Sequence, residues 1–401
     1  MNRARSLSFL SLAVVVATTA SISRTEAAEP RLEKADVFTA GERGFAGYRI
    51  PGIVVTKAGS VLAYCEARKH SKSDWGEIEI HLRRSTDGGR TWDAPRQIAH
   101  MGPRVARNPV ALAKKSGGPA DQTVNNPVAI TDQVTGAVHL LYCIEYMRCF
   151  YLRSDDDGVT WSSPTEITAT FEEFRPEYNW RVIATGPGHG IQLRNGRLLV
   201  PVWLSTSKTS PHGPTVAATI YSDDHGGTWQ RGELVTTERF GPNESAVVEL
   251  SDGRVLLNAR QRTAAPHRLV VTSRDGATGW SEPRFDPALT EPVCMAGMVM
   301  IPASAPQTRS RLIFTNPASG TRERKNLTTR ISEDDGQTWS YSRSLESGPS
   351  AYSDLAVLPD GTILCFYERG VHSEKPSPYD ALTLARFNME WIMQPNVGVK
   401  K

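Results

Sequence analysis

Charged and aromatic side chains recur at matching positions of several apolar hairpins. Each hairpin reads as a strand, a glycine turn and a second strand, and the polar side chains stand nine or ten residues before the turn glycine and seven after it. These positions hold Arg49 and Glu66 around Gly59, Asn243, Glu244 and Arg260 around Gly253, Tyr352 and Glu368 around Gly361, and Trp203 after Gly196. Because polar groups at the ends of apolar strands are costly when unpaired, these residues must be paired or used.

Arginine, glutamate and tyrosine side chains at one place can do specific chemistry. Guanidinium forks bind carboxylates in a planar, bidentate way, and a carboxylate beside a tyrosine can take the phenol proton during an attack. Each hairpin starts at one rim, turns at the other and returns, so these positions share the starting rim. Around a closed propeller, such strand ends converge on the central axis and form one cluster.

The number of hairpins defines the expected fold. Glycine turns between apolar runs lie at Gly59, Gly136, Gly196, Gly253 and Gly361. The last interval is about twice the others, and "GMVMIPASAPQTRSRLIFTNP" fills it as a sixth hairpin with a looser turn. The pattern predicts an all-β, six-bladed β-propeller of four-stranded antiparallel blades over residues 29–401.

A second repeat has the frame S-x-D-x-G-x-T-W. Its copies are "STDGGRTW" from Ser85, "SDDDGVTW" from Ser154, "SDDHGGTW" from Ser222, "SEDDGQTW" from Ser332 and the less regular "SRDGATGW" from Ser273. This Asp box follows a third strand that leads away from the charged rim, so we expect it at the opposite rim. There its Asp accepts backbone N–H groups, its Gly permits a positive φ and its Trp packs between strands. We therefore interpret Asp87 as a scaffold residue.

The N-terminal segment indicates export. Positive charge at residues 2–5 precedes "LSFLSLAVVVATTA", an apolar run too short to span a membrane, and small residues follow. We expect residues 1–28 to be a signal peptide, with an uncleaved anchor as the alternative. The mature chain is expected to be secreted or periplasmic, to act as a monomer and to have no integral membrane span.

Composition and cysteine spacing narrow the partners. The net charge is +3 without blocks of one sign, so we expect no nucleic-acid partner. Three of the five cysteines sit in apolar strand-like runs, which favours buried thiols. Because no cysteine or histidine pair has metal-ligand spacing, we expect no metal, and nothing indicates a cofactor.

The motifs together resemble a known family. "YRIP" from Tyr48, the Asp boxes, "NES" before a strand ending in "NAR", and "AYSDLAVLPDG" from Ala351 resemble the exo-sialidases (neuraminidases) with Asp-box, or BNR, repeats. The resemblance covers nearly the whole mature chain. An Asp box alone is weak evidence for this family, because secreted non-enzymes carry it too. Its combination with "YRIP" and the late tyrosine is specific evidence. The resemblance implies a six-bladed propeller that cleaves terminal sialic acid without a metal.

The resemblance implies three catalytic residues. Tyr352 is similar to the nucleophile, Glu244 to its partner, and Asp74 of "KSDWG" to the acid/base. A neutral tyrosine avoids the repulsion that a carboxylate nucleophile would meet from the substrate's own carboxylate. Asp74 lies in a loop that can fold over the substrate, where desolvation would raise its pKa. The alternatives are core packing for Tyr352 and an exposed loop acid or helix cap for Asp74.

The resemblance also implies substrate-binding residues, namely Arg49, Arg260 and Arg324 on the sialic acid carboxylate, Arg68 near the sugar's 4-position and Glu368 supporting an arginine. Arg49 could instead form a structural ion pair with Glu368, and Arg322 and Arg330 lie near Arg324. Trp203 lines the glycerol or acyl pocket or only packs.

The expected function is that of a retaining exo-α-sialidase, a glycoside hydrolase acting on sialylated glycans, glycoproteins or glycolipids. One alternative is a non-catalytic Asp-box propeller that acts as a binding module. That alternative predicts a broken set of polar rim residues, whereas all the expected types are present. A second alternative is a relative that acts on another nonulosonic acid, transfers the sugar or releases an anhydro product.

Overall fold

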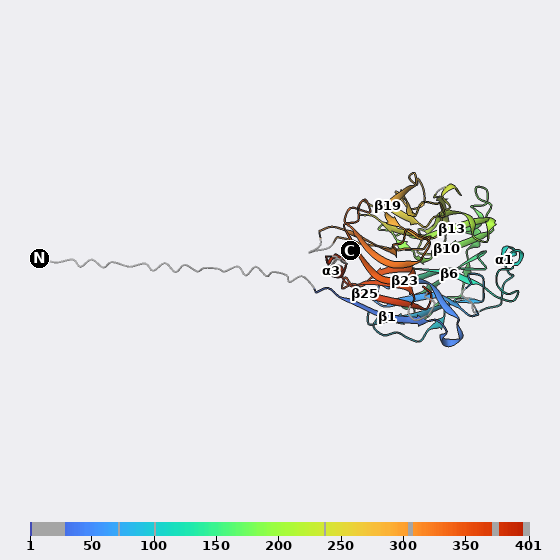
Figure 1. Ribbon diagram of the computed structural model, residues 1–401, viewed down its shortest axis with the longest axis horizontal. Coiled ribbons are helices and arrows are strands. Elements are labelled where there is room, and N and C mark those ends of the chain that lie inside the picture. The colour runs from blue at the N-terminus through green and yellow to red at the C-terminus, as the bar shows by residue number, and fades with distance from the viewer. Residues whose placement is uncertain are drawn as a thin grey trace.

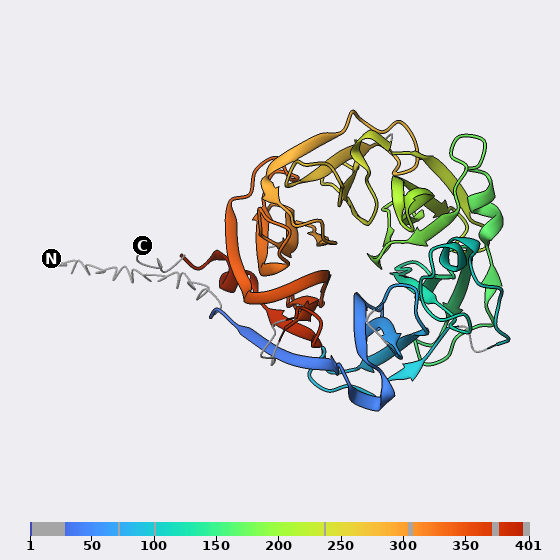
Figure 2. The same ribbon diagram turned by 45° about the vertical axis from the view of Figure 1, so that its right-hand side comes forward.

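Apolar runs separated by glycine turns fold into antiparallel β-sheets arranged around a ring (Figure 1, Figure 2). The computed structural model describes residue 1 and residues 29–70, 73–99, 102–235, 238–303, 308–370 and 377–395. The expected signal peptide lies, apart from residue 1, outside the described residues. In the described part, no helix is long and apolar enough to cross a membrane.

Two of the sheets have four strands, as expected. One contains β2 (Gly47–Val55), β3 (Val61–Arg68), β4 (Ile78–Ser85) and β5 (Arg96–Gln97). The other contains β16 (Ser245–Glu249), β17 (Val255–Ala259), β18 (His267–Ser273) and β19 (Arg284–Thr290). In both, consecutive strands pair in chain order, which is the pattern of a propeller blade.

Two further sheets gain a short extra strand. The first contains β6 (Val124–Thr131), β7 (Val138–Ile144), β8 (Arg148–Ser154) and β9 (Thr165–Glu166), with β11 (Gly188–His189) added to β6. The second contains β10 (Val182–Thr185), β13 (Leu198–Ser210), β14 (Gly213–Ser222) and β15 (Gln230–Leu234), with β12 (Ile191–Gln192) also paired to β13.

The hairpin expected around Gly196 differs from the prediction. Its first strand is split, because β10 and β12 pair with β13 while β11, between them, leaves to pair in parallel with β6 of the neighbouring sheet. The Tyr64 hydroxyl donates a hydrogen bond to the Gly188 carbonyl at 2.8 Å. The segment therefore links two sheets rather than completing one.

The expected all-β propeller with four-stranded antiparallel blades is confirmed, but hydrogen bonding divides the described chain into five sheets rather than the six blades predicted. The largest has seven strands, in the order β1 (Leu32–Thr39), β25 (Ala381–Phe387), β24 (Ile363–Arg369), β23 (Tyr341–Val357), β22 (Lys325–Ser332), β21 (Arg311–Pro317) and β20 (Gly297–Ile301). The 17-residue β23 pairs with β22 along its first part and with β24 along its second, so it joins two arrays. The looser hairpin expected from Gly297 is confirmed as β20 and β21.

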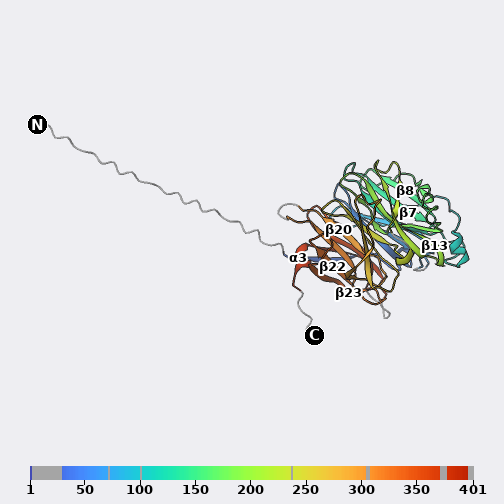
Figure 3. The same ribbon diagram turned by 90° about the horizontal axis from the view of Figure 1, so that it is seen from above.

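The two ends of the chain meet in this sheet. Strand β1 pairs antiparallel with β25, so the first strand of the fold lies on the edge of the last array. In Figure 2 the blue start of the chain lies beside its red end and completes the ring. Strands β20, β22 and β23 lie on one side of the molecule, and β7, β8 and β13 lie on the other (Figure 3).

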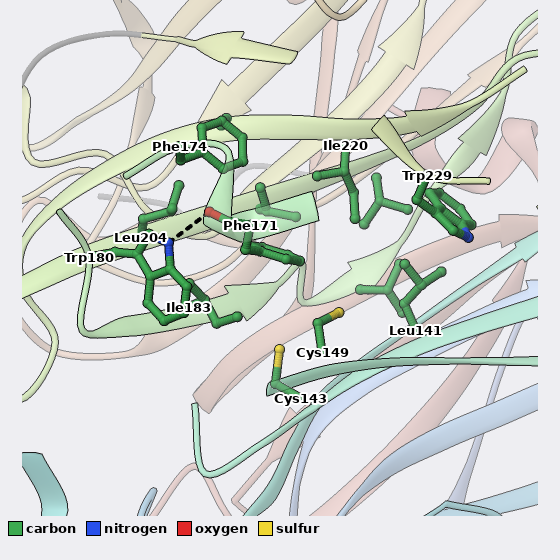
Figure 4. Packing of buried hydrophobic residues seen from close by; sticks show 14 of the residues in the cluster. Leu141, Cys143, Cys149, Phe171, Phe174, Trp180, Ile183, Leu204, Ile220 and Trp229 are labelled. Atoms are coloured by element: carbon green, nitrogen blue, oxygen red, sulfur yellow. Dashed lines mark hydrogen bonds between the residues drawn. The ribbon is translucent and has the colours of Figure 1, made fainter. Parts of the chain in front are cut away.

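The helices are short, namely α1 (Pro109–Ala113), α2 (Thr168–Glu172), α3 (Met389–Met393) and the 3-10 turns η1 (Glu42–Gly44) and η2 (Glu238–Phe240). Stability therefore comes mainly from packing between sheets. One apolar cluster joins side chains of β7 and β8 to those of β13 and β14, and the Trp180 indole donates to the Phe171 carbonyl at its edge (Figure 4). Cys143 and Cys149 lie in this cluster, and all five cysteines are buried and free, which confirms the expected buried thiols.

The Asp boxes lie where strand parity placed them. Ser85, the last residue of β4, stands opposite Val61 beside the glycine turn, whereas Ile78 stands opposite Arg68 at the other end. Asp87 accepts from the Thr91 N–H and hydroxyl at 2.9 and 2.7 Å. The other boxes repeat this contact, and the Trp that ends each of the five boxes packs against an apolar cluster. The boxes are therefore structural turns.

Candidate active site

The site lies at the other ends of these strands, where inner strands are interrupted by bulges. The register shifts between Arg49 and Gly52 in β2, between Asn125 and Val128 in β6, and between Ser350 and Ser353 in β23. Ile50 and Asn126 have φ values of 61° and 53°, in the left-handed region, which asparagine adopts fairly readily but a β-branched isoleucine seldom does. Bulges redirect side chains, and here they occur beside the pocket described below.

Buried carboxylates hold these bulges. Glu368, with no exposed surface, accepts the backbone N–H groups of Ile50 and Tyr352, both at 3.1 Å. It also accepts from Arg49 Nε at 3.0 Å and Nη2 at 3.4 Å. Glu368 therefore supports both an arginine and the strand that carries Tyr352.

The centre of the site is the pair of Tyr352 and Glu244. The Tyr352 hydroxyl lies 2.7 Å from Glu244 Oε1 and 2.6 Å from Oε2, and both residues are buried. Arg260 Nη1 donates to the Tyr352 hydroxyl at 2.6 Å and also pairs with Glu244. The strand ends that parity placed on one rim are thus in contact.

The protonation states of this pair suit proton transfer. Burial raises the pKa of Tyr352 well above its usual range, outweighing the opposing effect of Arg260. Burial acts to raise the pKa of Glu244, but Arg260 and the Tyr352 hydroxyl outweigh it and lower that pKa. Glu244 is therefore an ionised base beside a protonated phenol.

Three arginines surround this tyrosine. The guanidinium carbons of Arg49 and Arg324 lie 5.4 and 5.2 Å from the centre of the Tyr352 ring, and Arg260 contacts its hydroxyl. Arg49 pairs with Glu368 and Arg260 with Glu244, whereas Arg324 donates to the Tyr379 hydroxyl and the Val293 carbonyl. Among the described residues, Arg324 has no carboxylate within ion-pair distance, so an anionic ligand can supply one.

Asp74 lies at the edge of this arginine group, in the loop between β3 and β4. Its Oδ1 is 2.8 Å from Arg68 Nη1 and 3.5 Å from Arg49 Nη1, and its side chain is 44% exposed. Burial acts to raise the pKa of Asp74, but Arg68 and Arg49 outweigh it and hold the pKa well below its usual range. In this arrangement Asp74 is ionised, so the raised pKa expected of it requires a change of partners.

Arg68 lies behind Asp74 and has no exposed surface. Its Nε and Nη2 donate to Glu66 at 3.1 and 2.6 Å, and Glu66 also accepts the Asn126 N–H at 2.9 Å. Arg68 is absent from the lining of the small pocket, so in the ligand-free protein it contacts Asp74 rather than the open space.

These groups line a pocket of about 120 Å³, formed by Arg49, Ile50, Asp74, Asn126, Tyr146, Trp203, His212, Asn243, Glu244, Arg260, Arg262, Arg324 and Tyr352. Trp203 therefore faces the pocket, which also has Tyr146 on its wall. No group of three or more His, Cys, Asp or Glu side chains in the described chain could hold a metal ion.

The pocket residues that sequence reasoning missed include Tyr146, His212 and Arg262. Tyr146 lies in the turn between β7 and β8, and His212 lies in the turn between β13 and β14. Both turns are at the same rim as Glu66, so strand parity applied to the later strands would have found them. Arg262 follows Arg260 by two residues, the spacing that returns to one face of an extended chain.

The sequence matches known sialidases. It is 33% identical to a sialidase of Micromonospora viridifaciens over 98% of this chain and 61% of the relative. It is 30% identical to a sialidase of Bacteroides fragilis over 83% of this chain and 62% of the relative. The chain thus spans about three-fifths of the length of these two relatives. An exo-alpha-sialidase of Aspergillus fumigatus is 28% identical over 88% of this chain and 87% of its own.

Solved structures and a family model agree with this relationship. A structure described as a Hadza microbial sialidase superposes with a TM-score of 0.73 and 28% identity, covering 90% of this chain and 69% of its own. The intramolecular trans-sialidase from Ruminococcus gnavus, at 20% identity and a TM-score of 0.72, covers 90% of this chain and 98% of its own, and shares the fold. The family model of a BNR repeat-like domain matches residues 106–365. The chain belongs to the sialidase family with BNR repeats.

Proposed function

We propose that this chain is a retaining exo-α-sialidase that hydrolyses terminal α-linked sialic acids of glycans, glycoproteins or glycolipids. The contact between the Tyr352 hydroxyl and Glu244, at 2.6 and 2.7 Å, carries the proposal. Most glycosidases use two carboxylates, and sialidases with a tyrosine nucleophile are an exception. A buried phenol beside an ionised carboxylate has no evident use in a binding module.

In the proposed first step, the Tyr352 oxygen forms a bond to the anomeric carbon while its proton passes to Glu244. The bond from that carbon to the leaving oxygen breaks, and the leaving oxygen takes the proton of Asp74. In the second step Asp74 takes a proton from water, the water oxygen replaces Tyr352 at the anomeric carbon, and Glu244 returns its proton to the phenol oxygen. Two displacements at one carbon give net retention.

In this proposal the arginines select the substrate by binding its carboxylate. Sialic acid carries a carboxylate on the anomeric carbon itself, so a group that fixes the carboxylate also fixes the reacting atom. Arg324, which has no carboxylate partner among the described residues, and Arg49 and Arg260 beside it suit that anion. In this proposal Trp203 lines the part of the pocket that takes the glycerol or acyl substituent.

The same proposal extends to the blade count and the location. We read the seven-stranded sheet as two blades that share β23, the outer strand of one and the inner strand of the next, which makes six blades in all. The positively charged and apolar N-terminal segment supports export by a signal peptide. A secreted or periplasmic monomer remains the proposed state.

The test is release of a fluorophore from an α-sialoside by the wild-type protein and by Tyr352→Phe. Loss of the nucleophile should lower kcat by about 10³-fold or more, as removal of a covalent catalyst does elsewhere. NMR of the wild-type reaction should show the α-anomer of free sialic acid first. Equal activity of the two proteins would exclude Tyr352 as the nucleophile. If the product were an anhydro sugar or a sugar transferred to an acceptor, the reaction would be that release or transfer and not hydrolysis.

A further inference from the structure

One guanidinium in the pocket serves two carboxylates at once. Arg49 uses Nε and Nη2 for Glu368, at 3.0 and 3.4 Å, and its remaining nitrogen, Nη1, lies 3.5 Å from Asp74 Oδ1. Glu368 is fully buried and also holds two backbone N–H groups, so it is fixed in place. Nη1, which faces Asp74, makes no contact with Glu368 and therefore has the most N–H groups left for a ligand.

The second partner of Asp74 is equally fixed. Arg68 has no exposed surface, and Glu66 holds its Nε and Nη2, leaving Nη1 for Asp74 at 2.8 Å. Asp74 is different, because 44% of its side chain is exposed and it lies between β3 and β4 rather than on a strand. In this group of five side chains, Asp74 is the one that can change partners.

The charges around Asp74 come from several strands and turns. They are Arg49 on β2, Glu66 and Arg68 on β3, Tyr146 in the β7–β8 turn and His212 in the β13–β14 turn. Burial lowers the pKa of His212 to about 4, and burial raises the pKa of Tyr146, so both are neutral near pH 6. Two arginines and one glutamate therefore decide the state of Asp74.

We propose that Asp74 occupies, in the ligand-free protein, the place on Arg49 that the carboxylate of the substrate takes, and that Arg68 is the positioning residue that retains Asp74 until then. This inference rests on the proposed function, because it concerns the same pocket and the same acid/base. Binding exchanges one carboxylate for another on Arg49. The acid/base is released only when an anionic sugar is present.

The exchange has a consequence for protons. When the ligand arrives, Asp74 loses Arg49 and gains a neighbouring negative charge, and both changes favour its protonated form. The protein should therefore take up a proton from solvent on binding, on Asp74, which is the proton that the leaving oxygen later needs. Without this exchange, Asp74 would stay ionised beside two arginines and could not act as an acid.

The experiment measures proton uptake with the mature chain and a 2,3-unsaturated sialic acid analogue, which keeps the carboxylate and cannot be hydrolysed. Titration calorimetry in two buffers of different ionisation enthalpy, between pH 5 and 7, gives the number of protons bound. The methyl ester of the same analogue lacks the anion. The variants are Asp74→Asn and, as a matched control, Asp87→Asn at the opposite rim.

In wild type and Asp87→Asn, the number of protons taken up per site on binding should approach one as the pH falls. Asp74→Asn should take up none. Asp74→Asn should also bind the acid about 2- to 5-fold more tightly, because an internal competitor is gone, with no gain for the ester. In Arg68→Gln the pH of half-maximal uptake should rise, and in Arg68→Lys, which keeps the charge, it should rise less.

Uptake by Asp74→Asn equal to that of wild type, or no gain in its affinity for the acid, would overturn the exchange. If both Arg68 variants still bind the analogue and their pH of half-maximal proton uptake equals that of wild type, Arg68 does not position Asp74. If the analogue does not bind wild type at all, the proposed function fails as well. Binding without Asp74-dependent uptake refutes the exchange alone.

Discussion

Asp74 and Asp87 stand at opposite ends of strand β4, and each has a pKa below its usual range for a different reason. Asp87 is stabilised by neutral donors of its own turn, chiefly the N–H and hydroxyl of Thr91 and the hydroxyl of Ser85. For Asp74, Arg68 and Arg49 on two other strands overcome the effect of burial. The first set of partners forms with the turn, whereas the second requires β2 and β3 to pair in one sheet.

This difference separates a structural acid from a functional one. Donors within one turn cannot be replaced by a ligand, so Asp87 keeps its partners in every state of the protein. Arginines at a pocket can accept another anion, so the partners of Asp74 can change. A repeated acid whose partners lie in its own turn therefore indicates a structural role, and an unrepeated acid held by cations on other strands indicates chemistry.

The largest expected effect tests this separation directly. Asp74→Asn should lower kcat/KM for a sialylated oligosaccharide by about 10²- to 10⁴-fold, because the leaving oxygen then lacks a proton donor. An aryl sialoside with a good leaving group should lose less. Steady-state kinetics on both substrates measure the two losses.

Asp87→Asn provides the control for that loss. It should keep the wild-type kcat/KM for each folded molecule, because its contacts lie within the Asp box. If Asp87→Asn lost activity to the same degree as Asp74→Asn, the two acids would not differ in the way proposed.

A medium effect tests how the Asp box is anchored. Gly158 has a φ of 80°, and a Cβ there would lie 2.7 Å from a Leu62 methyl of the neighbouring sheet. Gly158→Ala should reduce the free energy of unfolding by about 2–4 kcal/mol, from backbone strain and overpacking together. Gly59, with a φ of 90° and nothing within 4 Å, is the matched position.

At that matched position, Gly59→Ala should reduce the free energy of unfolding by only about 1–2 kcal/mol, from backbone strain alone. Urea unfolding of both variants measures the difference, which isolates the packing of the box against the next sheet. Equal losses would mean that the box does not contribute to contacts between sheets.

Much of the site could be predicted from the sequence because successive side chains of a strand point to opposite faces, with a period of two residues. That period placed Arg49 opposite Glu66, as the register shows, and brought Tyr352, Glu244 and Arg260 to one rim. It applies wherever a buried strand and a glycine turn give a clear starting point. The distances between sheets and the pKa of Asp74 did not follow, because they depend on residues from separate strands.

Other features left no clear pattern in the sequence. The first half of β23 is partly exposed and polar, so it gave no alternation to reveal that one strand joins two arrays. The pairing of β11 with β6 is parallel and distant in sequence, and no local rule predicts it. Tyr146 and His212 lie in turns between later strands, which the hairpin pattern around each turn glycine does not cover.

The smallest effect concerns acid stability. The Asp156 carboxylate accepts from the Thr160 hydroxyl and N–H, which lowers its pKa to about 2, below the value of about 4 in an unfolded chain. Because the folded pKa is the lower one, this contribution to stability is complete above pH 4 and is lost as the pH falls through 2. Asp156→Asn should therefore be less stable than wild type by about 1 kcal/mol at pH 6, and the gap should close toward pH 2. Thermal unfolding of both proteins from pH 6 downward measures the gap, and a constant gap would show that the contacts of Asp156 do not depend on its charge.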